Sequence, residues 1–258
     1  MAPTDHTDLI EVDAQNVDQH GFFCLMSRRK SPGWQAKRAW LDARFAEGMK
    51  IRLLGGGKRG FIETIPAEHC WRAINASGYL AIHCVWVVGR SKGEGLGRKL
   101  LDSALADAKA GGFKGVVMLT SDGNWLASPK FLAHHGFETV ETSYPPFSIM
   151  LHKFDATAPD PTYSGDFDKR IRASGSGLTV IVTGQCPYLA DAVAAVETVA
   201  EARGLPIRID TLHSAEDVRA RAPSPYGVFA ILADGKLVSY CYQTAKDLNK
   251  ILDKLGAG

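Results

Sequence analysis

A basic, glycine-rich segment at residues 89–99, Gly-Arg-Ser-Lys-Gly-Glu-Gly-Leu-Gly-Arg-Lys, has the composition of an anion-binding turn. The apolar run over residues 79–88 before it predicts a central strand, and apolar residues at helical spacing follow it as far as Gly111. In such a turn, free backbone N–H groups and the positive end of the helix dipole face the bound group. Lys92 and Arg98 add positive charge, so the segment predicts a site for an anion.

The spacing of the glycines argues against two other phosphate-binding motifs. A P-loop needs G-x-x-x-x-G-K-[ST], which residues 55–58 lack, so we predict a hairpin turn there. A dinucleotide-binding fold needs G-x-G-x-x-G and an acidic residue about 20 positions further on. Here Gly93, Gly95 and Gly97 have the spacing G-x-G-x-G, and Asp122 lies only close to the end of the next apolar run.

The elements that would hold this turn lie in residues 1–155, which we predict to be one domain. The pattern indicates a helix from Pro32 to Gly48, two strands over residues 49–54 and 60–65, and a further strand over 115–120. A stretch rich in Pro, Gly, Ser and charge follows and predicts a linker at residues 156–176, with a second domain at 177–258.

The second domain has a regular alternation of patterns. The expected order is strand, helix, strand, helix, strand, strand, helix (βαβαββα), over residues 178–183, 186–203, 206–212, 214–221, 226–232, 236–240 and 244–255.

Two motifs of the first domain resemble the GNAT acetyltransferase superfamily. Residues 92–97, Lys-Gly-Glu-Gly-Leu-Gly, fit its motif A, [RQ]-x-x-G-x-[GA], with Lys in the Arg/Gln position, and residues 131–137 resemble its FYxxxGF helix end. The strings KRAWL, FIETIPAEHCW, CVWVVG, SPKFL and QCPY extend the resemblance to YoaP-type acetyltransferases over nearly the whole chain. The implied fold class is α/β (α+β), with a GNAT-type mixed central sheet flanked by helices.

The resemblance implies a cofactor and the residues that bind it. In this family the loop amides hold the pyrophosphate of coenzyme A, and the preceding strand splays from its neighbour and bonds the pantetheine arm. The implied co-substrate is acetyl-CoA or another acyl-CoA, and no metal is expected. The candidate cofactor-binding residues are Trp86, Val87, Val88, Lys92, Gly93, Glu94, Gly95, Leu96, Gly97 and Arg98.

The resemblance implies fewer of the catalytic groups than of the cofactor-binding residues. Leu132 stands where many family members have the Tyr that protonates the leaving thiolate, and Tyr144 is the nearest tyrosine downstream. An ammonium acceptor also needs a base, for which His83 and Glu63 are candidates. By alternation His83 would share a strand face with Ala81, Val85 and Val87. The alternatives are a hydrogen-bonded core histidine, an outward-facing Glu63, and a packing or lid role for Tyr144.

The second domain resembles a thioredoxin or glutaredoxin core. Cys186-Pro-Tyr-Leu stands at the first strand-to-helix turn, where glutaredoxins carry CPYC, and Pro225 precedes the third strand, where that fold keeps a cis-proline. Leu189 replaces the second cysteine, and dithiol exchange needs a resolving thiol. Cys186 is therefore a candidate reactive thiol at a helix N-terminus, and a domain kept for packing or substrate delivery is the alternative.

Composition excludes several other classes of protein. Of 258 residues, 45% are hydrophobic and 22% charged, which is incompatible with disorder throughout. The net charge of +2 disfavours a nucleic-acid partner, and no apolar run approaches the roughly 18 residues of a membrane span. The segment MAPTDHTDLI lacks a secretory pattern, so the five cysteines are expected to be thiols in a reducing cytoplasm.

The sequence thus predicts an N-acyltransferase that uses an acyl-CoA and a small-molecule amine, with direct attack of the amine in a ternary complex. One alternative keeps the fold but changes the chemistry, to a lyase or thiol reaction on a sulfur-containing metabolite in a biosynthetic pathway. Another alternative is a sensor that binds CoA or a thiol without turnover.

Overall fold

The computed structural model describes residues 8–123, 125–144 and 146–256, and it divides the chain into two compact units. Unit 1 comprises the described residues up to 26, with 42–70 and 76–162. Unit 2 comprises 27–41, 71–75 and the described residues from 163 on. Most of the segment MAPTDHTDLI lies outside the described residues.

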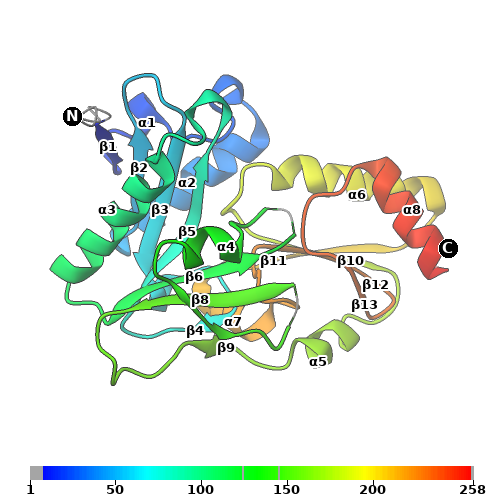
Figure 1. Cartoon of the computed structure of the whole chain (residues 1–258). Helices are drawn as coiled ribbons and strands as arrows, with labels where there is room; N and C mark the ends of the chain where they lie inside the picture. Colours follow the sequence, from blue (N-terminus) through cyan, green and yellow to red (C-terminus); the bar gives the residue numbers. More distant parts are fainter. Residues whose placement is uncertain (1–7, 124, 145, 257–258) are drawn as a thin grey trace. The chain divides into compact units, whose positions relative to one another are not determined.

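Unit 1 is built on a seven-stranded mixed sheet in the order β1-β2-β3-β5-β6-β8-β7 (Figure 1). Only β5 and β6 pair in parallel; the other neighbours are antiparallel. This confirms the predicted mixed sheet. The strands are β1 (Leu9–Val12), β2 (Lys50–Leu54), β3 (Gly60–Pro66), β5 (Leu80–Val87), β6 (Gly115–Ser121), β7 (Glu138–Glu141) and β8 (Phe147–Lys153).

The helices of unit 1 include α1 (Val17–His20), α3 (Leu96–Ala110) and α4 (Pro129–Ala133), with short 3-10 turns η2 (Ala67–His69) and η3 (Gly89–Ser91). Helix α2 (Pro32–Ala46) and the 3-10 turn η1 (Met26–Arg28) contribute residues to both units. The predicted hairpin at residues 55–58 is confirmed, since β2 and β3 pair across it and Lys58 N donates to Gly55 O at 3.1 Å.

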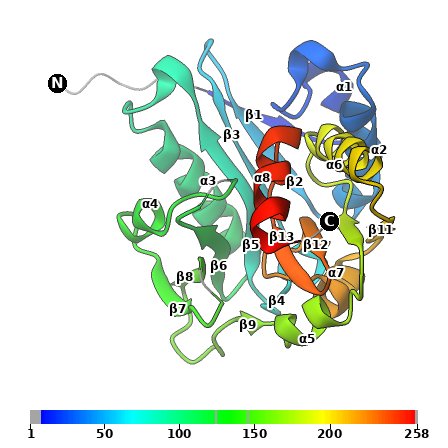
Figure 2. The same cartoon turned by 90° about the vertical axis from the view of Figure 1, so that its right-hand side faces the viewer.

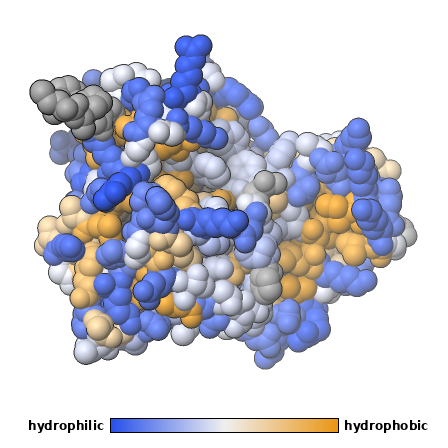
Figure 3. All heavy atoms as spheres, in the orientation of Figure 1, coloured by the Kyte–Doolittle hydropathy of each residue, from blue (hydrophilic) through white to orange (hydrophobic). Residues whose placement is uncertain are grey.

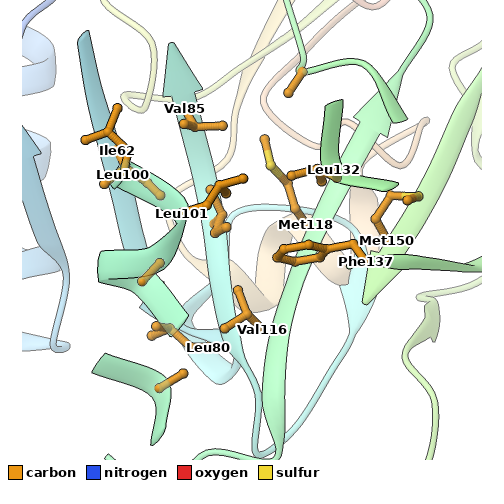
Figure 4. Packing of buried hydrophobic residues seen from close by; sticks show 14 of the residues in the cluster. Ile62, Leu80, Val85, Leu100, Leu101, Val116, Met118, Leu132, Phe137 and Met150 are labelled. Carbon is orange, nitrogen blue, oxygen red and sulfur yellow. The ribbon is translucent and has the colours of Figure 1, made fainter. Parts of the chain in front are cut away.

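The main core of unit 1 lies between α3 and one face of the sheet (Figure 4). Buried residues recur on α3 with helical spacing and meet apolar side chains from β3, β5 and β6. They include Leu96, Leu100, Leu101, Ala104 and Ala108 of α3, with Ile62, Leu80, Ile82, Val85, Val116 and Met118 of the sheet. This core fixes α3, and therefore its first turn, against the central strands.

Unit 2 has a four-stranded sheet in the order β11-β10-β12-β13. Strand β10 pairs in parallel with β11 and antiparallel with β12, and β12 pairs antiparallel with β13. Helices α6 and α8 pack together along this sheet (Figure 2). The elements are α5 (Phe167–Arg172), β10 (Leu178–Val182), α6 (Leu189–Arg203), β11 (Ile207–Thr211), α7 (Ala215–Arg221), β12 (Phe229–Ala233), β13 (Lys236–Ser239) and α8 (Ala245–Leu255).

The order βαβαββα predicted from residue 178 onward is observed; two boundaries differ by three residues and the others by at most one. Helix α6 begins at Leu189 because residues 186–188 form a turn before it. Strand β12 begins at Phe229 because Gly227, at φ +74°, closes a turn in which its N–H donates to Ser224 O. The relation of this unit to thioredoxin-like folds stays a prediction.

Residues 156–176, predicted to be a linker, contain regular structure. Strand β9 (Thr162–Tyr163) pairs with β4 (Ile74–Asn75) in a two-stranded sheet, and α5 follows it. Asp166 caps α5 by accepting a hydrogen bond from Lys169 N at 2.9 Å.

Hydrophilic and apolar residues are interspersed on the face of the molecule shown in Figure 3. None of the helices within the described residues combines the length and the apolar character needed to span a membrane.

Candidate functional site

The central strands of unit 1 separate part of the way along their length. The ladder between β5 and β6 pairs Leu80–Ile82 with Val116–Met118, whereas β5 runs on to Val87 and β6 to Ser121. Each strand stays paired on its outer side, β5 with β3 and β6 with β8. The two halves of the sheet therefore diverge beyond Ile82, as the splay of the preceding strand predicts.

Backbone groups of β5 face this divergence. Val88 N donates to Arg59 O at 2.9 Å, so the pair Arg59 and Val88 is a hydrogen-bonded pair of the antiparallel ladder. Because such pairs alternate with non-hydrogen-bonded ones, the N–H and C=O groups of Val85 and Val87 point away from β3. They point toward the side of β6, beyond the end of its ladder.

The turn after β5 leads directly into the first turn of α3. Gly93 and Gly95 have φ of +83° and +77°, and a Cβ at either position would meet open space. Gly95 is the N-cap and supplies no side-chain acceptor, and no acidic residue stands in the first turn. The N–H groups of Leu96 and Gly97 have no acceptor within the helix, and they lie at the positive end of its dipole, where an anion can accept from them.

The divergence and the turn open onto one cavity of about 680 Å³ within unit 1. It is lined by Val85, Trp86, Val87, Ser91, Lys92, Gly93, Gly95, Leu96, Gly97, Arg98, Ala127, Ser128, Phe131, His134 and His135. The cavity is bounded by cations at the turn and by apolar side chains along β5. It fits an elongated ligand with an anionic part and a less polar arm.

The structure places most of the predicted cofactor-binding residues in this cavity lining. The two that do not line it are Val88, whose N–H donates to Arg59 O, and Glu94, whose carboxylate forms an ion pair with Lys58 at 2.5 Å. The lining residues are Trp86, Val87, Lys92, Gly93, Gly95, Leu96, Gly97 and Arg98.

Sequence reasoning missed the contribution of the α4 region. Ser128 caps α4 by accepting from Lys130 N at 3.3 Å, and Phe131 lies against α3, where a Cβ on Gly97 would meet its ring at 3.0 Å. His134 and His135 follow and also line the cavity. The signal in the sequence was the adjacent histidine pair inside the FxxxxGF segment.

His83 and Glu63 lie at a β-bulge between β3 and β5. Glu63 pairs with Cys84 and Thr64 pairs with Ile82, so His83 is the additional residue on β5. Both side chains are buried, with His83 0% and Glu63 3% exposed. Neither is among the residues that line the cavity described above.

The bulge corrects the predicted alternation along β5. Val85 lies in the core cluster with Leu80 and Ile82, and Val87 packs against it, so these residues face α3. Ala81 and Val85, which the alternation placed on one face, therefore lie on opposite faces. The extra residue at His83 shifts the inward–outward alternation of side chains between Ile82 and Val85. The alternation that predicted a common face for His83 and Val85 therefore does not hold across the bulge.

Leu132 is fully buried and belongs to the core cluster, so it contributes packing and no proton. Tyr144 is half-buried, its carbonyl accepts from Phe147 N at 3.0 Å, and it is not among the cavity-lining residues. The structure therefore places the three catalytic candidates, His83, Glu63 and Tyr144, outside the described lining.

Cys186 lies in unit 2, in the turn between β10 and α6, and is half-buried. The turn is tightly packed: Gln185 Oε1 accepts from Arg72 Nη1 at 2.6 Å, and the Arg72 guanidinium lies over the Tyr226 ring at 5.1 Å. Arg72 thus joins the turn that carries Cys186 to the segment that follows Pro225.

The segment Glu68-His69-Cys70 serves a structural purpose. The Glu68 carboxylate accepts from Gly78 N at 2.7 Å and from Ser77 Oγ at 2.9 Å. Burial raises the pKa of Glu68, but these hydrogen bonds outweigh it and hold the pKa below its usual range. Among the described residues, no group of three or more His, Cys, Asp or Glu side chains is placed to hold a metal ion.

Comparison with known proteins agrees with this geometry. Residues 17–137 match the model of the Acetyltransferase (GNAT) family, in agreement with the resemblance of the motifs at residues 92–97 and 131–137. The enzyme class is acetyltransferase. The chain is also similar to the protein named Uncharacterized N-acetyltransferase YoaP of Bacillus subtilis (strain 168), with 28% identity over 249 residues, 95% of this chain and 98% of that protein.

Solved structures similar to the chain are also GNAT proteins. The acetyltransferase of Staphylococcus aureus Mu50 is 15% identical, with a TM-score of 0.44 over 58% of this chain and 99% of that chain. The GNAT acetyltransferase of Brucella melitensis, solved in complex with acetyl-CoA, is 18% identical, with a TM-score of 0.39 over 62% and 97% of the two chains.

Proposed function

We propose that unit 1 binds an acyl-CoA, with acetyl-CoA as the first candidate, and transfers the acyl group to a primary amine of a small molecule. The amine attacks the thioester directly in a ternary complex. The observation that carries the proposal is that the β5–β6 divergence and the first turn of α3 open onto one cavity. The acetyltransferase family of this domain supports the choice of cofactor.

The backbone would do most of the binding. The N–H groups of Leu96, Gly97 and Arg98 at the start of α3 would hold the pyrophosphate, with the charge of Lys92 beside them. The N–H groups of Val85 and Val87 point toward the divergence and would bond the pantetheine arm and the thioester carbonyl. As the tetrahedral intermediate forms, these fixed donors would stabilise its oxyanion without reorganisation.

The proton of the attacking ammonium would be removed by His83 or Glu63. Both are buried beside the bulge of β5, and a bulge redirects side chains relative to the regular strand. In general, the surroundings of a buried group can bring its pKa close to the value that a general base needs. Tyr144 is the candidate for protonating the departing thiolate.

Leu132 favours one alternative. A buried leucine at the position of the usual proton donor leaves the thiolate without an acid there. A scaffold that no longer performs ordinary acetyl transfer, and that acts on a sulfur-containing metabolite as a lyase or in thiol chemistry, would not need this acid. Binding of a thiol ligand in preference to CoA would support this alternative.

The test is calorimetric titration of the full chain with acetyl-CoA and CoA, using Gly95→Glu as the disrupting variant. The new carboxylate would stand at the positive end of α3, and we expect a loss of affinity of about 100-fold or more. Gly56→Glu is the matched control, because Gly56 has φ +60° and open space around its Cβ but lies in the β2–β3 hairpin.

Micromolar binding that Gly95→Glu abolishes and Gly56→Glu preserves would support the proposal, and an acceptor screen of small amines would then follow. If neither acetyl-CoA nor CoA binds the unmodified chain, the proposal is wrong. If Gly95→Glu binds both ligands as tightly as the unmodified chain, the anion site is not at Gly95.

A further inference from the structure

The two border strands of the sheet in unit 2 are protected to different degrees. At one border, β13 begins with Lys236, its ladder with β12 has a register shift between Ile231 and Leu232, and α5 packs against it. At the other border, β11 pairs with β10 in an unbroken register over its five residues and contains no lysine. Bulges, lysines and covering elements are the usual protection of a border strand against pairing with another strand. Strand β11 is therefore the less protected border of this sheet.

Alternate residues of β11 direct their backbone groups out of the sheet. Leu178 N donates to Pro206 O at 2.8 Å, which fixes the phase of the parallel ladder between β10 and β11. Successive residues of a strand point their N–H and C=O groups to opposite sides, so Arg208 and Asp210 bond to β10. The residues whose N–H and C=O groups point away from β10 are Ile207, Ile209 and Thr211.

The side chains of β11 have the character of a strand-pairing surface. Ile209 is 40% exposed, although it is a large apolar residue. Arg208 is exposed and makes a long hydrogen bond of 3.4 Å to Thr179 Oγ1. Asp210 is half-buried and uses one carboxylate oxygen, Oδ1, in an ion pair with Arg221 of α7. The strand thus presents an apolar side chain on one face and two opposite charges, on either side of it, on the other face.

These charges select one register for an antiparallel pair of β11 strands. If Ile209 lies opposite the partner's Ile209, Arg208 lies opposite the partner's Asp210, and two-fold symmetry forms the same pair twice. Sliding one strand by two residues is the smallest shift that keeps the outward backbone groups paired. It would place either Arg208 opposite the partner's Arg208 or Asp210 opposite the partner's Asp210. Like charges directly opposite each other are destabilising, whereas opposite charges stabilise a strand pair.

We infer that β11 pairs antiparallel with β11 of a second copy of this chain, with Ile209 on the two-fold axis. The outward N–H and C=O groups of Ile209 bond those of the partner's Ile209, so the two sheets join into one. The pairs of Arg208 with the partner's Asp210 fall between these hydrogen bonds, where opposite side chains are closest. The strand shares no residue with the lining of the cavity in unit 1, so the inference is independent of acyl-CoA binding.

The size of the contact sets the expected strength. A pair of five-residue strands is small compared with the roughly 1,200–2,000 Å² that stable interfaces bury. We therefore expect a weak dimer, with a Kd of about 10–100 µM. Sedimentation equilibrium of the full chain over about 1–300 µM would cover this range.

The first variant tests the axis of the proposed dimer. Ile209→Lys would bring two ammonium groups together at the two-fold axis and remove the apolar contact, so we expect dimerisation to weaken about tenfold or more. Thr198→Lys is the matched control, because it introduces the same side chain at an exposed position of α6. It should leave the Kd of the dimer nearly unchanged. Thermal unfolding of each variant checks that it folds.

A pair of charge variants tests the register. Arg208→Glu would set a second carboxylate against the partner's Asp210, and Asp210→Lys would set a second cation against the partner's Arg208. Each variant alone should dimerise about tenfold more weakly than the unmodified chain. In an equimolar mixture, the new carboxylate of one variant faces the new ammonium of the other, and the unchanged Asp210 faces the unchanged Arg208. We expect the mixture to recover the affinity of the unmodified chain.

Weakening of each charge variant alone, with recovery in the mixture, would support the inference. A chain that stays monomeric at every concentration would overturn it and leave β11 available to a strand of another protein. A dimer that Ile209→Lys does not weaken would be formed through another surface, which also overturns the inference. If folded charge variants stay equally weak when mixed, the register is wrong and the proposed strand pair is refuted.

Discussion

The chain contains two turns in which a buried strand leads into a 15-residue helix, and they are built in opposite ways. In unit 1 the turn before α3 has glycines at positive φ, with open space around Gly93 and Gly95, and it borders a cavity. In unit 2 the turn before α6 is filled: a Cβ on Gly184 would meet the Trp40 side chain at 2.9 Å, and Gln185 is buried.

Neither helix has a side-chain cap at its N-terminus. In α6, however, the N–H of Leu189 donates to Cys186 O at 3.2 Å and Asp191 stands in the first turn, whereas α3 has no acidic residue there. The two turns also differ in what their surroundings leave accessible. A strand-to-helix turn is therefore only a potential anion site. Glycines that keep space free, and cations beside them, make it usable.

The largest effect on the packed turn is expected from the substitution Gly33→Ala in unit 2. A Cβ at Gly33 would lie 1.9 Å from the carbonyl oxygen of Pro187, so the backbone of one segment has to move. We expect unit 2 to lose about 3 kcal/mol of stability, the upper part of the range for overpacking. Hydrogen exchange of the β10 and β12 amides in the full chain would measure it.

Gly204→Ala is the control for Gly33→Ala. Gly204 ends α6 at φ +63° with open space around it, so the substitution costs only about 1 kcal/mol through the backbone conformation. Equal effects of the two substitutions would show that the packing around Pro187 is not tight.

A smaller effect is expected from Arg72→Met, which removes the hydrogen bond to Gln185 and the stacking over Tyr226. Arg72 is only 3% exposed, and loss of a buried charge-assisted hydrogen bond costs about 2 kcal/mol. Denaturant-induced unfolding, monitored by hydrogen exchange of the β10 amides, would measure this loss of stability. The control Arg208→Met, on the exposed side of β11, should change stability by about 0.5 kcal/mol or less.

The smallest expected effect concerns how α3 is anchored away from its open end. Arg52 donates to both oxygens of Asp107, at 2.5 and 3.0 Å, and Lys50 lies 3.5 Å from the same carboxylate. Asp107→Asn should destabilise unit 1 by about 1 kcal/mol at pH 7. Thermal unfolding across a pH series would measure the difference from the unmodified chain.

The sign of that pH dependence follows from the carboxylate. Burial raises the pKa of Asp107, but the hydrogen bonds and charges of Arg52 and Lys50 outweigh it, so the folded-state pKa is lowered. The stabilisation is therefore present above the unfolded pKa of about 3.9 and is lost as the pH falls through the folded value. A difference between the two proteins that persists unchanged well below pH 3 would contradict this explanation.

Much of the open turn could be predicted from sequence because its signal is local. The spacing of Gly93, Gly95 and Gly97 after an apolar run and before a helical pattern defines the geometry without reference to distant residues. Helix starts also have local signals: Ser214, for example, is an N-cap whose hydroxyl accepts a hydrogen bond from Asp217 N in the first turn of α7.

The bulge at His83 could not be predicted in the same way. The run of residues 79–88 is apolar on both faces, so it contains no alternation whose break would reveal an extra residue. Likewise, residues 27–41 and 71–75 belong to unit 2 through contacts distant in sequence, which composition does not record. His134 and His135 lie within the motif at residues 131–137, but only the folded chain shows that they line the cavity.

The divergence of β5 from β6 gives unit 1 an internal sheet edge. Backbone donors and acceptors that another strand would satisfy are left along Val85 and Val87, in the middle of the sheet and not at its border. Edge strands attract foreign strands, and proteins protect them by covering or charging them. An acyl-CoA lying in the divergence would complete the missing row of hydrogen bonds. We therefore expect the cofactor to suppress aggregation of the chain as well as to take part in the reaction.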